Sequence, residues 1–179
     1  MINRRLLFAG GASFFACEAN SAPRPDLGYA PQFIVGRNRE NIADIFVSLT
    51  CVDSFRAYSS TIAPFIRQNV AGGHASVVFH NLVRNDRDLE FSADVLAAAP
   101  GQYGALCLAL LAYGAKQGKA LARDDIPQLM RHLRITRRGG FSRSKAQQSL
   151  ALMNKYAREN LRVSSTPTYM KNGSSSWSL

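Results

Sequence analysis

Apolar residues near the start of the chain gather into two short runs that have the pattern of β-strands. Residues 32–36 form a short run, and residues 42–49 form a longer and nearly continuous one. A strand covered on both faces has such continuous apolar sequence, whereas a strand with one exposed face alternates apolar and polar residues. The second run therefore predicts a central strand of a parallel sheet.

The pattern then changes to a helical period and returns to a strand. Apolar residues recur at helical spacing through residues 55–66, Pro64 interrupts them, and Gly72-Gly73 ends the run. Because a proline inside a helix removes a hydrogen bond, we expect a helix that is kinked at Pro64. Residues 75–80 again have the pattern of a strand. Together these segments predict a βαβ unit with a right-handed crossover.

The next part of the chain is predicted to be helical throughout. The segments with a helical period are separated by glycine or by Pro100-Gly101, and they comprise residues 93–99, 103–117, 126–133 and 142–160. Ser142 is a residue type that commonly caps a helix at its N-terminus. We therefore expect an all-helical insertion over residues 93–160.

The end of the chain has the pattern of a β-hairpin. Residues 162–170 are predicted to be extended, Lys171-Asn172-Gly173 is a strong turn signal, and residues 174–179 can pair back as an antiparallel strand.

Composition is that of an ordinary globular protein with a strong positive charge. The 179 residues, 46% of them hydrophobic, suit one domain or one domain with an insertion. The net charge is +10, but the basic residues are scattered, with a modest concentration over residues 131–145 and no recognised nucleic-acid motif. A solvated basic surface is the simpler interpretation, nucleic-acid binding is disfavoured, and a site for anionic lipid or an acidic partner stays open.

Residues 1–21 have the pattern of an export signal. Arg4 and Arg5 precede an apolar stretch over residues 6–16, and small residues follow. The paired arginines resemble a twin-arginine signal loosely, so both the Sec and the twin-arginine routes stay open. We expect a signal peptide and a location in the periplasm or cell envelope. Lipidation at Cys17, or a buried first helix of a cytosolic protein, are the alternatives.

The cysteines beyond that segment have contrasting surroundings. Cys107 lies inside the apolar run 105–111 and is predicted to be part of the core, whereas Cys51 lies where a strand ends and a helix begins. Two cysteines do not make a disulfide framework. No cysteine or histidine has metal-ligand spacing, so we expect no metal, and the histidines are predicted to lie on the surface or in turns: His74, His80 and His132.

Two segments resemble the DsbA-like family of thioredoxin-fold proteins. Residues 46–55, Phe-Val-Ser-Leu-Thr-Cys-Val-Asp-Ser-Phe, are similar to the family's strand, turn and Cys-x-x-Cys motif, with Ser54 in place of the second cysteine. Residues 163–173, which contain Thr166-Pro167-Thr168, are similar to its cis-proline strand and hairpin. The resemblance extends over residues 33–173.

This resemblance implies an α/β protein with a thioredoxin fold and an inserted all-helical subdomain. The family normally has a C-terminal helix after the hairpin, and we expect this helix to be lacking here because the sequence ends at Leu179. The corresponding division is a signal peptide (1–21), an N-terminal part of the thioredoxin fold (22–92), the helical insertion (93–160) and a C-terminal β-hairpin (161–179). The family often has a buried acid six residues before the first cysteine. Here Ile45 occupies that position, and Asp44 is predicted to point to the opposite face of the strand.

The resemblance also implies site residues. A helix N-terminus lowers the pKa of a cysteine thiol, so Cys51 is expected to react as a thiolate, and Ser54, one turn later, is expected to donate its hydroxyl hydrogen to the sulfur. Thr166 is expected to hydrogen-bond an extended peptide through its backbone, beside a cis Pro167. An inert Cys51 and an ordinary trans proline are the alternatives.

The leading hypothesis is a monothiol thiol-disulfide oxidoreductase or isomerase that forms mixed disulfides through Cys51. Cysteine-containing proteins or peptides are the expected substrates, glutathione is a candidate co-substrate, and a membrane redox partner is a further candidate. No other cofactor is expected. Isomerisation or deglutathionylation fits better than oxidation, because an oxidase needs a second sulfur. The alternative is a catalytically degenerate peptide-binding or chaperone-like module.

Overall fold

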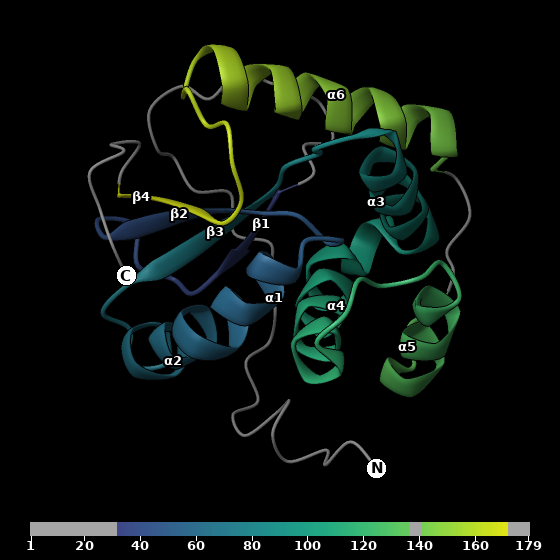
Figure 1. The fold of residues 1–179 in the computed structure, drawn as a ribbon. Helices are drawn as coiled ribbons and strands as arrows, with labels where there is room; N and C mark the ends of the chain where they lie inside the picture. Colours follow the sequence, from purple (N-terminus) through teal and green to yellow (C-terminus); the bar gives the residue numbers. More distant parts are fainter. Residues whose placement is uncertain (1–31, 137–140, 172–179) are drawn as a thin grey trace.

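The computed structural model describes residues 32–136 and 141–171 (Figure 1). The predicted signal peptide, the hairpin turn with its following strand, and most of the basic link after Ile135 lie outside the described residues.

A mixed four-stranded sheet is the centre of the fold. Its order is β1-β3-β2-β4, in which β2 and β3 are parallel and the two outer strands run antiparallel to their neighbours. The strands are β1 (Gln32–Val35), β2 (Ile42–Val47), β3 (Ser76–Asn81) and β4 (Thr168–Lys171). Every residue of β2 and β3 is buried, which confirms the prediction of a central strand from continuous apolar sequence.

One helical run follows β2 and returns the chain to β3. It consists of α1 (Val52–Ala57), a π-helical turn, α2 (Ala63–Phe65) and a second π-helical turn that ends at Val70. Pro64 has no N–H to donate, and the helix has widened turns on both sides of it rather than a break. Gly73 then adopts a φ of +76°, which favours glycine, and the chain turns into β3.

The helical insertion is present, and it begins earlier than residue 93. Its helices are α3 (Asp86–Ala98), a 3₁₀ turn (Pro100–Gln102), α4 (Tyr103–Gln117), α5 (Asp125–Leu133) and α6 (Arg143–Glu159). Ser142 caps α6 as predicted, accepting a hydrogen bond from the backbone N–H of Lys145 at 3.2 Å. The start of α3 was missed because its first turn is polar, and Asn85 caps it by accepting from Asp88 N at 3.0 Å.

The helices cover both faces of the sheet (Figure 1). The larger core cluster joins one face to α1 and α4, and it includes Cys107, which is 1% exposed, as predicted. The smaller cluster lies between the other face and α6, and it comprises Phe46, Leu82, Met153, Ala157, Val163 and Met170. Among the described residues no single helix is long and apolar enough to cross a membrane. Only α3 and the segment 100–117, taken together, reach the required length and apolar composition, and the chain bends by 94° between them.

His80 is not a surface histidine, which corrects the expectation from the sequence. It is 3% exposed in β3, its Nε2 lies 2.7 Å from Asp44 Oδ1, and its ring stacks on Phe46 with centroids 4.4 Å apart. The period of two places Asp44 on the α6 side of β2 and Ile45 in the larger core, as expected. His74 and His132 are exposed, as predicted.

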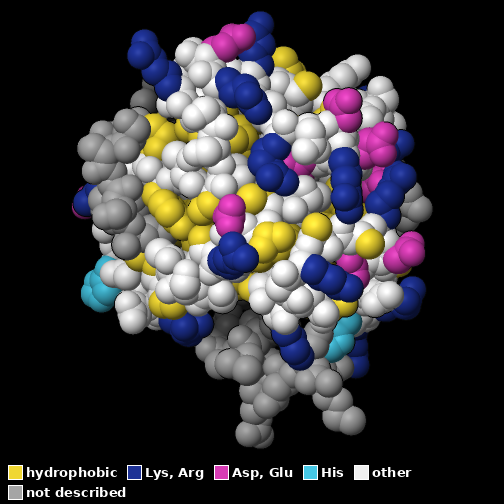
Figure 2. All heavy atoms as spheres, in the orientation of Figure 1, with side chains coloured by type: hydrophobic (Ala, Val, Ile, Leu, Met, Phe, Trp, Pro, Cys, Tyr) yellow, Lys and Arg dark blue, Asp and Glu magenta, His cyan; other side chains and the backbone are white. Residues whose placement is uncertain are grey.

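The charged surface is mixed rather than uniformly basic on the face that Figure 2 shows, where Lys and Arg side chains are scattered among acidic and apolar ones. Arg143 of α6, one member of the basic concentration over residues 131–145, contacts Asp94 of α3 at 2.9 Å and Glu90 at 3.7 Å. Arg123, in the loop before α5, also pairs with Asp94. These ion pairs join parts of the insertion, which supports the interpretation of a solvated surface.

Candidate active site at Cys51

Cys51 lies at the junction between β2 and α1, as its position in the sequence predicts. It is the N-cap residue of α1, with extended backbone angles, and its carbonyl accepts the hydrogen bond from Phe55 N at 3.1 Å. A tight turn precedes it, in which Cys51 N donates to Ser48 O at 3.2 Å. Its sulfur is therefore next to the unpaired N–H groups at the start of the helix.

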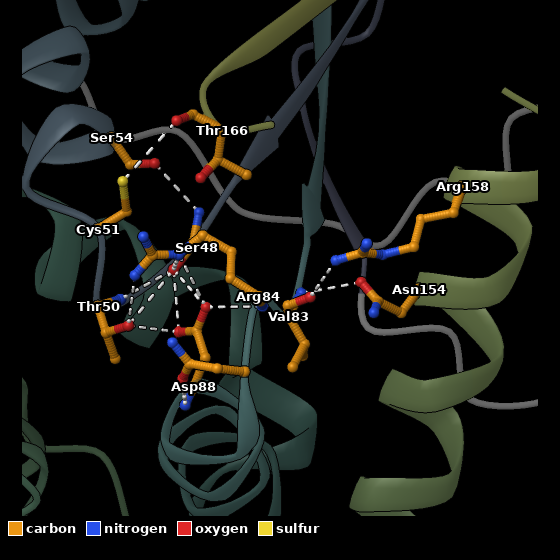
Figure 3. Close-up of polar contacts among 11 residues, drawn as sticks. Ser48, Thr50, Cys51, Ser54, Val83, Arg84, Asp88, Asn154, Arg158 and Thr166 are labelled. Carbon is orange, nitrogen blue, oxygen red and sulfur yellow. Dashed lines mark hydrogen bonds and ion pairs between the residues drawn. The ribbon is translucent and has the colours of Figure 1, made fainter. Parts of the chain in front are cut away.

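The segment around Pro167 lies beside this sulfur. The peptide bond between Thr166 and Pro167 is cis, and the Cys51 thiol donates a weak hydrogen bond to Thr166 O, with a sulfur–oxygen distance of 3.8 Å (Figure 3). Antiparallel pairing of β4 with β2, which places Phe46 opposite Thr168, brings together residues that are far apart in the sequence. The structure thus joins Cys51, Thr166 and Pro167 in one site.

Ser54 belongs to this site, but its hydroxyl has a different partner from the one expected. Ser54 is fully buried, and its Oγ accepts a hydrogen bond from Ser48 N at 3.1 Å. No hydrogen bond joins its hydroxyl to Cys51 Sγ, and the backbone N–H of Ser54 is the group that interacts with the sulfur. The sequence identified the residue, whereas the backbone geometry of the helix start decided which of its atoms faces the sulfur.

The surroundings of Cys51 favour its thiolate form. Burial alone raises the pKa of the thiol, because the residue is only 5% exposed. The backbone N–H of Ser54, the Thr166 hydroxyl, the positive charge of Arg84 and the backbone N–H of Asp53 act in the opposite direction. Their sum outweighs burial, so the pKa of Cys51 lies below its ordinary value.

The pKa of Cys107 is shifted in the opposite direction. It is enclosed by the core, and burial raises the pKa of its thiol well above the ordinary value, although a hydrogen bond with Tyr103 partly offsets this effect. Of the two described cysteines, only Cys51 has the electrostatic surroundings of a nucleophile.

A buried polar network beneath Cys51 was not anticipated from the sequence. The Asp88 carboxylate, at the start of α3, is fully buried and accepts hydrogen bonds from Ser48 Oγ at 2.8 and 2.9 Å and from Thr50 Oγ1 at 2.5 Å. Arg84 donates to the same carboxylate through its backbone N at 3.0 Å and its Nε at 3.2 Å. We call these four residues, Ser48, Thr50, Arg84 and Asp88, the Asp88 network (Figure 3).

A local signal for part of this network exists in the sequence. Asn85 and Asp88 have the spacing of a helix N-cap and its third residue, which marks the start of α3. That signal gives no reason for Asp88 to be buried, because Ser48 and Thr50, whose hydroxyls bind its carboxylate, come from the distant turn after β2. Within residues 32–136 and 141–171, no cluster of three or more His, Cys, Asp or Glu side chains could hold a metal ion.

Comparison with solved structures identifies the fold that carries this candidate site. No family model and no curated protein matches the chain by sequence. Solved structures do match: a protein-disulfide isomerase from Novosphingobium aromaticivorans has a TM-score of 0.59 and 16% identity over 80% of this chain and 88% of that chain. For α-DsbA1 of Wolbachia pipientis the TM-score is 0.60, with 11% identity over 83% and 76% of the two chains. The chain has the DsbA-like thioredoxin fold.

The match includes both the mixed sheet and the helical insertion of this DsbA-like fold. ScsC of Proteus mirabilis has a TM-score of 0.61 at 16% identity, covering 82% of this chain and 66% of that chain. Identities this low establish the fold alone. The chemistry of the Cys51-x-x-Ser54 motif in this chain has to be argued from its own geometry.

Proposed function

We propose that this DsbA-like chain is a monothiol thiol-disulfide oxidoreductase or isomerase that forms mixed disulfides through Cys51. The observation that carries the proposal is the position of the Cys51 sulfur, at the start of a helix and 3.8 Å from the carbonyl of a residue in a cis peptide bond with Pro167. The lowered pKa of Cys51 adds to this, because the thiolate is the nucleophilic form.

The proposed reaction is disulfide exchange in two steps. The Cys51 thiolate attacks one sulfur of a substrate disulfide, a new sulfur–sulfur bond forms, and the other substrate sulfur leaves as a thiolate. A second thiol, from the substrate or from glutathione, then attacks the mixed disulfide and releases Cys51 as a thiolate. One disulfide is consumed and one is formed, so the exchange needs no separate oxidant.

Within the described residues no second thiol is placed to perform the release step, so we assign this step to an external thiol. Ser54 occupies the position of a resolving cysteine and has no sulfur, and Cys107, the other described cysteine, is 1% exposed in the core. An exchange without an internal resolving thiol suits isomerisation or removal of glutathione from proteins. It does not suit net oxidation of substrates, which needs an internal disulfide to be reduced.

The proposed substrates are cysteine-containing proteins or peptides, with glutathione as a co-substrate. An extended peptide that hydrogen-bonds the backbone of Thr166 would lie next to the sulfur of Cys51, in a form of strand addition. The proposed location is the periplasm or cell envelope, and it is supported by Arg4, Arg5 and the apolar stretch that follows them.

A non-catalytic peptide-binding module is the second candidate, and one observation favours it. Cys51 is only 5% exposed, so its sulfur offers little surface to a bulky disulfide. Such a module would keep the binding site beside Pro167 without using the thiol.

The first prediction separates these two candidates. In the full chain, we expect Cys51 to be alkylated by iodoacetamide with a pH midpoint below that of the same cysteine in the unfolded chain, about 8.5. Oxidised glutathione should add one glutathione to Cys51, and excess reduced glutathione should remove it. Peptide mass mapping assigns the modified cysteine.

Cys51→Ser and Cys107→Ser are the matched controls. The first should abolish the adduct, and the second should leave it unchanged because Cys107 is buried. An unperturbed midpoint together with no glutathione adduct in the wild type would rule out the exchange reaction and leave the peptide-binding module.

A further inference from the structure

Arg84 is the partly exposed member of the Asp88 network. Its side chain is 37% exposed, and two of its three nitrogen atoms, Nε and Nη2, donate hydrogen bonds. Nε donates to Asp88 Oδ2 and to Ser48 Oγ, both at 3.2 Å, and one terminal nitrogen, Nη2, donates to Thr50 Oγ1 at 3.2 Å. The guanidinium is thereby fixed in position by three side chains from two different segments.

The residues that Arg84 contacts adjoin Cys51, the residue that would react. Thr50 directly precedes Cys51 in the chain. Ser48 forms two hydrogen bonds with the start of α1: the Ser48 carbonyl accepts from Cys51 N at 3.2 Å, and the Ser48 N–H donates to Ser54 Oγ at 3.1 Å. Figure 3 shows the Arg84 guanidinium beside Thr50, on the side toward Cys51. A cation is thus anchored to the same turn that holds the sulfur.

We infer that Arg84 is a positioning residue for Cys51: anchored by Asp88, it fixes the turn that carries the sulfur and presents a stationary positive charge to the thiolate. This inference rests on the proposed function, because it concerns the same thiol. Nothing in the Cys-x-x-Ser motif itself supplies a cation, and the arginine comes from the loop that leads into α3.

Other charges near the sulfur do not replace this one. On α1, Asp53 forms an exposed ion pair with Arg56 at 3.1 Å, with the two side chains 67% and 77% exposed, so their charges largely cancel and are screened by water. Asp88 carries a negative charge and is the ion-pair partner of Arg84 at 3.2 Å, so it opposes the effect of Arg84 on the sulfur without supplying a positive charge of its own. The positive charge of Arg84 also lowers the pKa of Cys51, in agreement with this geometry.

An arginine suits this position better than a lysine would. Its planar guanidinium can donate to Asp88 and Ser48 from Nε and to Thr50 from Nη2 at once, whereas an ammonium on a flexible stem supplies a point charge. Arg84→Lys should therefore restore the charge but only part of the anchoring.

The test is the pH profile of Cys51 alkylation in Arg84→Gln. We expect the midpoint to rise by about half a pH unit, less than for a buried ion pair because Arg84 is partly exposed. At pH values below both midpoints, the alkylation rate should fall about threefold, since the thiolate fraction scales with that shift. At high pH, where the thiol is fully ionised, the two rates should converge.

Arg87→Gln is the matched control, because it removes the same charge from an exposed position at the start of α3. It should leave the midpoint unchanged, and Arg84→Lys should have a midpoint between those of wild type and Arg84→Gln. Circular dichroism checks that each variant is folded. If Arg84→Gln does not fold, Arg84→Met, which keeps most of the aliphatic stem, replaces it in the same measurement.

A folded Arg84→Gln or Arg84→Met with a wild-type midpoint would overturn the inference and reduce Arg84 to a structural role. This failure is distinguishable from failure of the proposed function, which would appear in the wild type as a missing glutathione adduct.

Discussion

Ser54 contributes two different groups to its neighbours at the start of α1. Its hydroxyl closes the turn before the helix by accepting from Ser48 N, and its backbone N–H interacts with the Cys51 sulfur. Any residue at this position except proline would supply that N–H. The Ser54 side chain therefore contributes to stability, whereas the support that Ser54 gives to the Cys51 thiolate comes from its main-chain N–H.

Ser54→Ala tests this division of roles. The buried N–H of Ser48 would lose its partner, so the free energy of unfolding should fall by about 1–3 kcal/mol. The alkylation midpoint of Cys51 should stay at the wild-type pH, because the backbone is unchanged. Urea unfolding and the pH profile measure the two effects separately. A clear rise in the midpoint would show that the hydroxyl itself supports the thiolate.

At the scale of elements, the position of α1 depends on how closely α4 can approach it. Gly114 of α4 faces the ring of Phe55 in α1, and a Cβ at Gly114 would lie 2.8 Å from that ring. Phe55 is 1% exposed and cannot move aside without disturbing the core. The glycine thus permits the close helix contact that holds the start of α1, and with it Cys51, against the insertion.

We expect Gly114→Ala to destabilise the protein by about 1–3 kcal/mol through overpacking, despite the better helix propensity of alanine. Gly101→Ala is the control, since a Cβ there meets nothing within 4 Å. Thermal and urea unfolding of both variants give the comparison. Equal stabilities would mean that Phe55 or α1 shifts freely to make room.

Over the whole molecule, the two described thiols should give opposite contributions to the pH dependence of stability. The pKa of Cys51 is lower in the folded than in the unfolded chain, so its stabilisation is fully present above the unfolded pKa and is lost as pH falls through the folded one. Cys107 has a raised pKa. Its contribution is present below the unfolded pKa and is lost as pH rises beyond it, because only the unfolded thiol then ionises.

This contrast can be measured by urea unfolding of the reduced proteins between pH 6 and about 9.5, a range that includes the ordinary thiol pKa of about 8.5. The difference in unfolding free energy between wild type and Cys51→Ala should increase with pH. The difference between wild type and Cys107→Ala should decrease above that pKa. Parallel slopes for the two variants would contradict the assigned environments.

The sequence by itself determined most of the order of the described elements, and it named candidate site residues. Continuous apolar runs marked the central strands, the glycines marked the ends of helices, and the local motifs pointed to Cys51 and Pro167. These features are local, because the period of apolar residues and the turn chemistry act over a few neighbouring residues. The core position of Cys107 followed in the same way from its apolar neighbours.

Only the tertiary structure decided which polar groups are buried together. His80 pairs with Asp44 because parallel strands bring their side chains to one face, and Asp88 is buried because a turn and a helix start, distant in the sequence, meet beneath Cys51. A buried charge is tolerated only where partners satisfy it, and those partners are selected by chain topology rather than by sequence neighbours. The inferred role of Arg84 also depends on partners that are distant in the sequence, Ser48 and Thr50, so it became visible only in the folded chain.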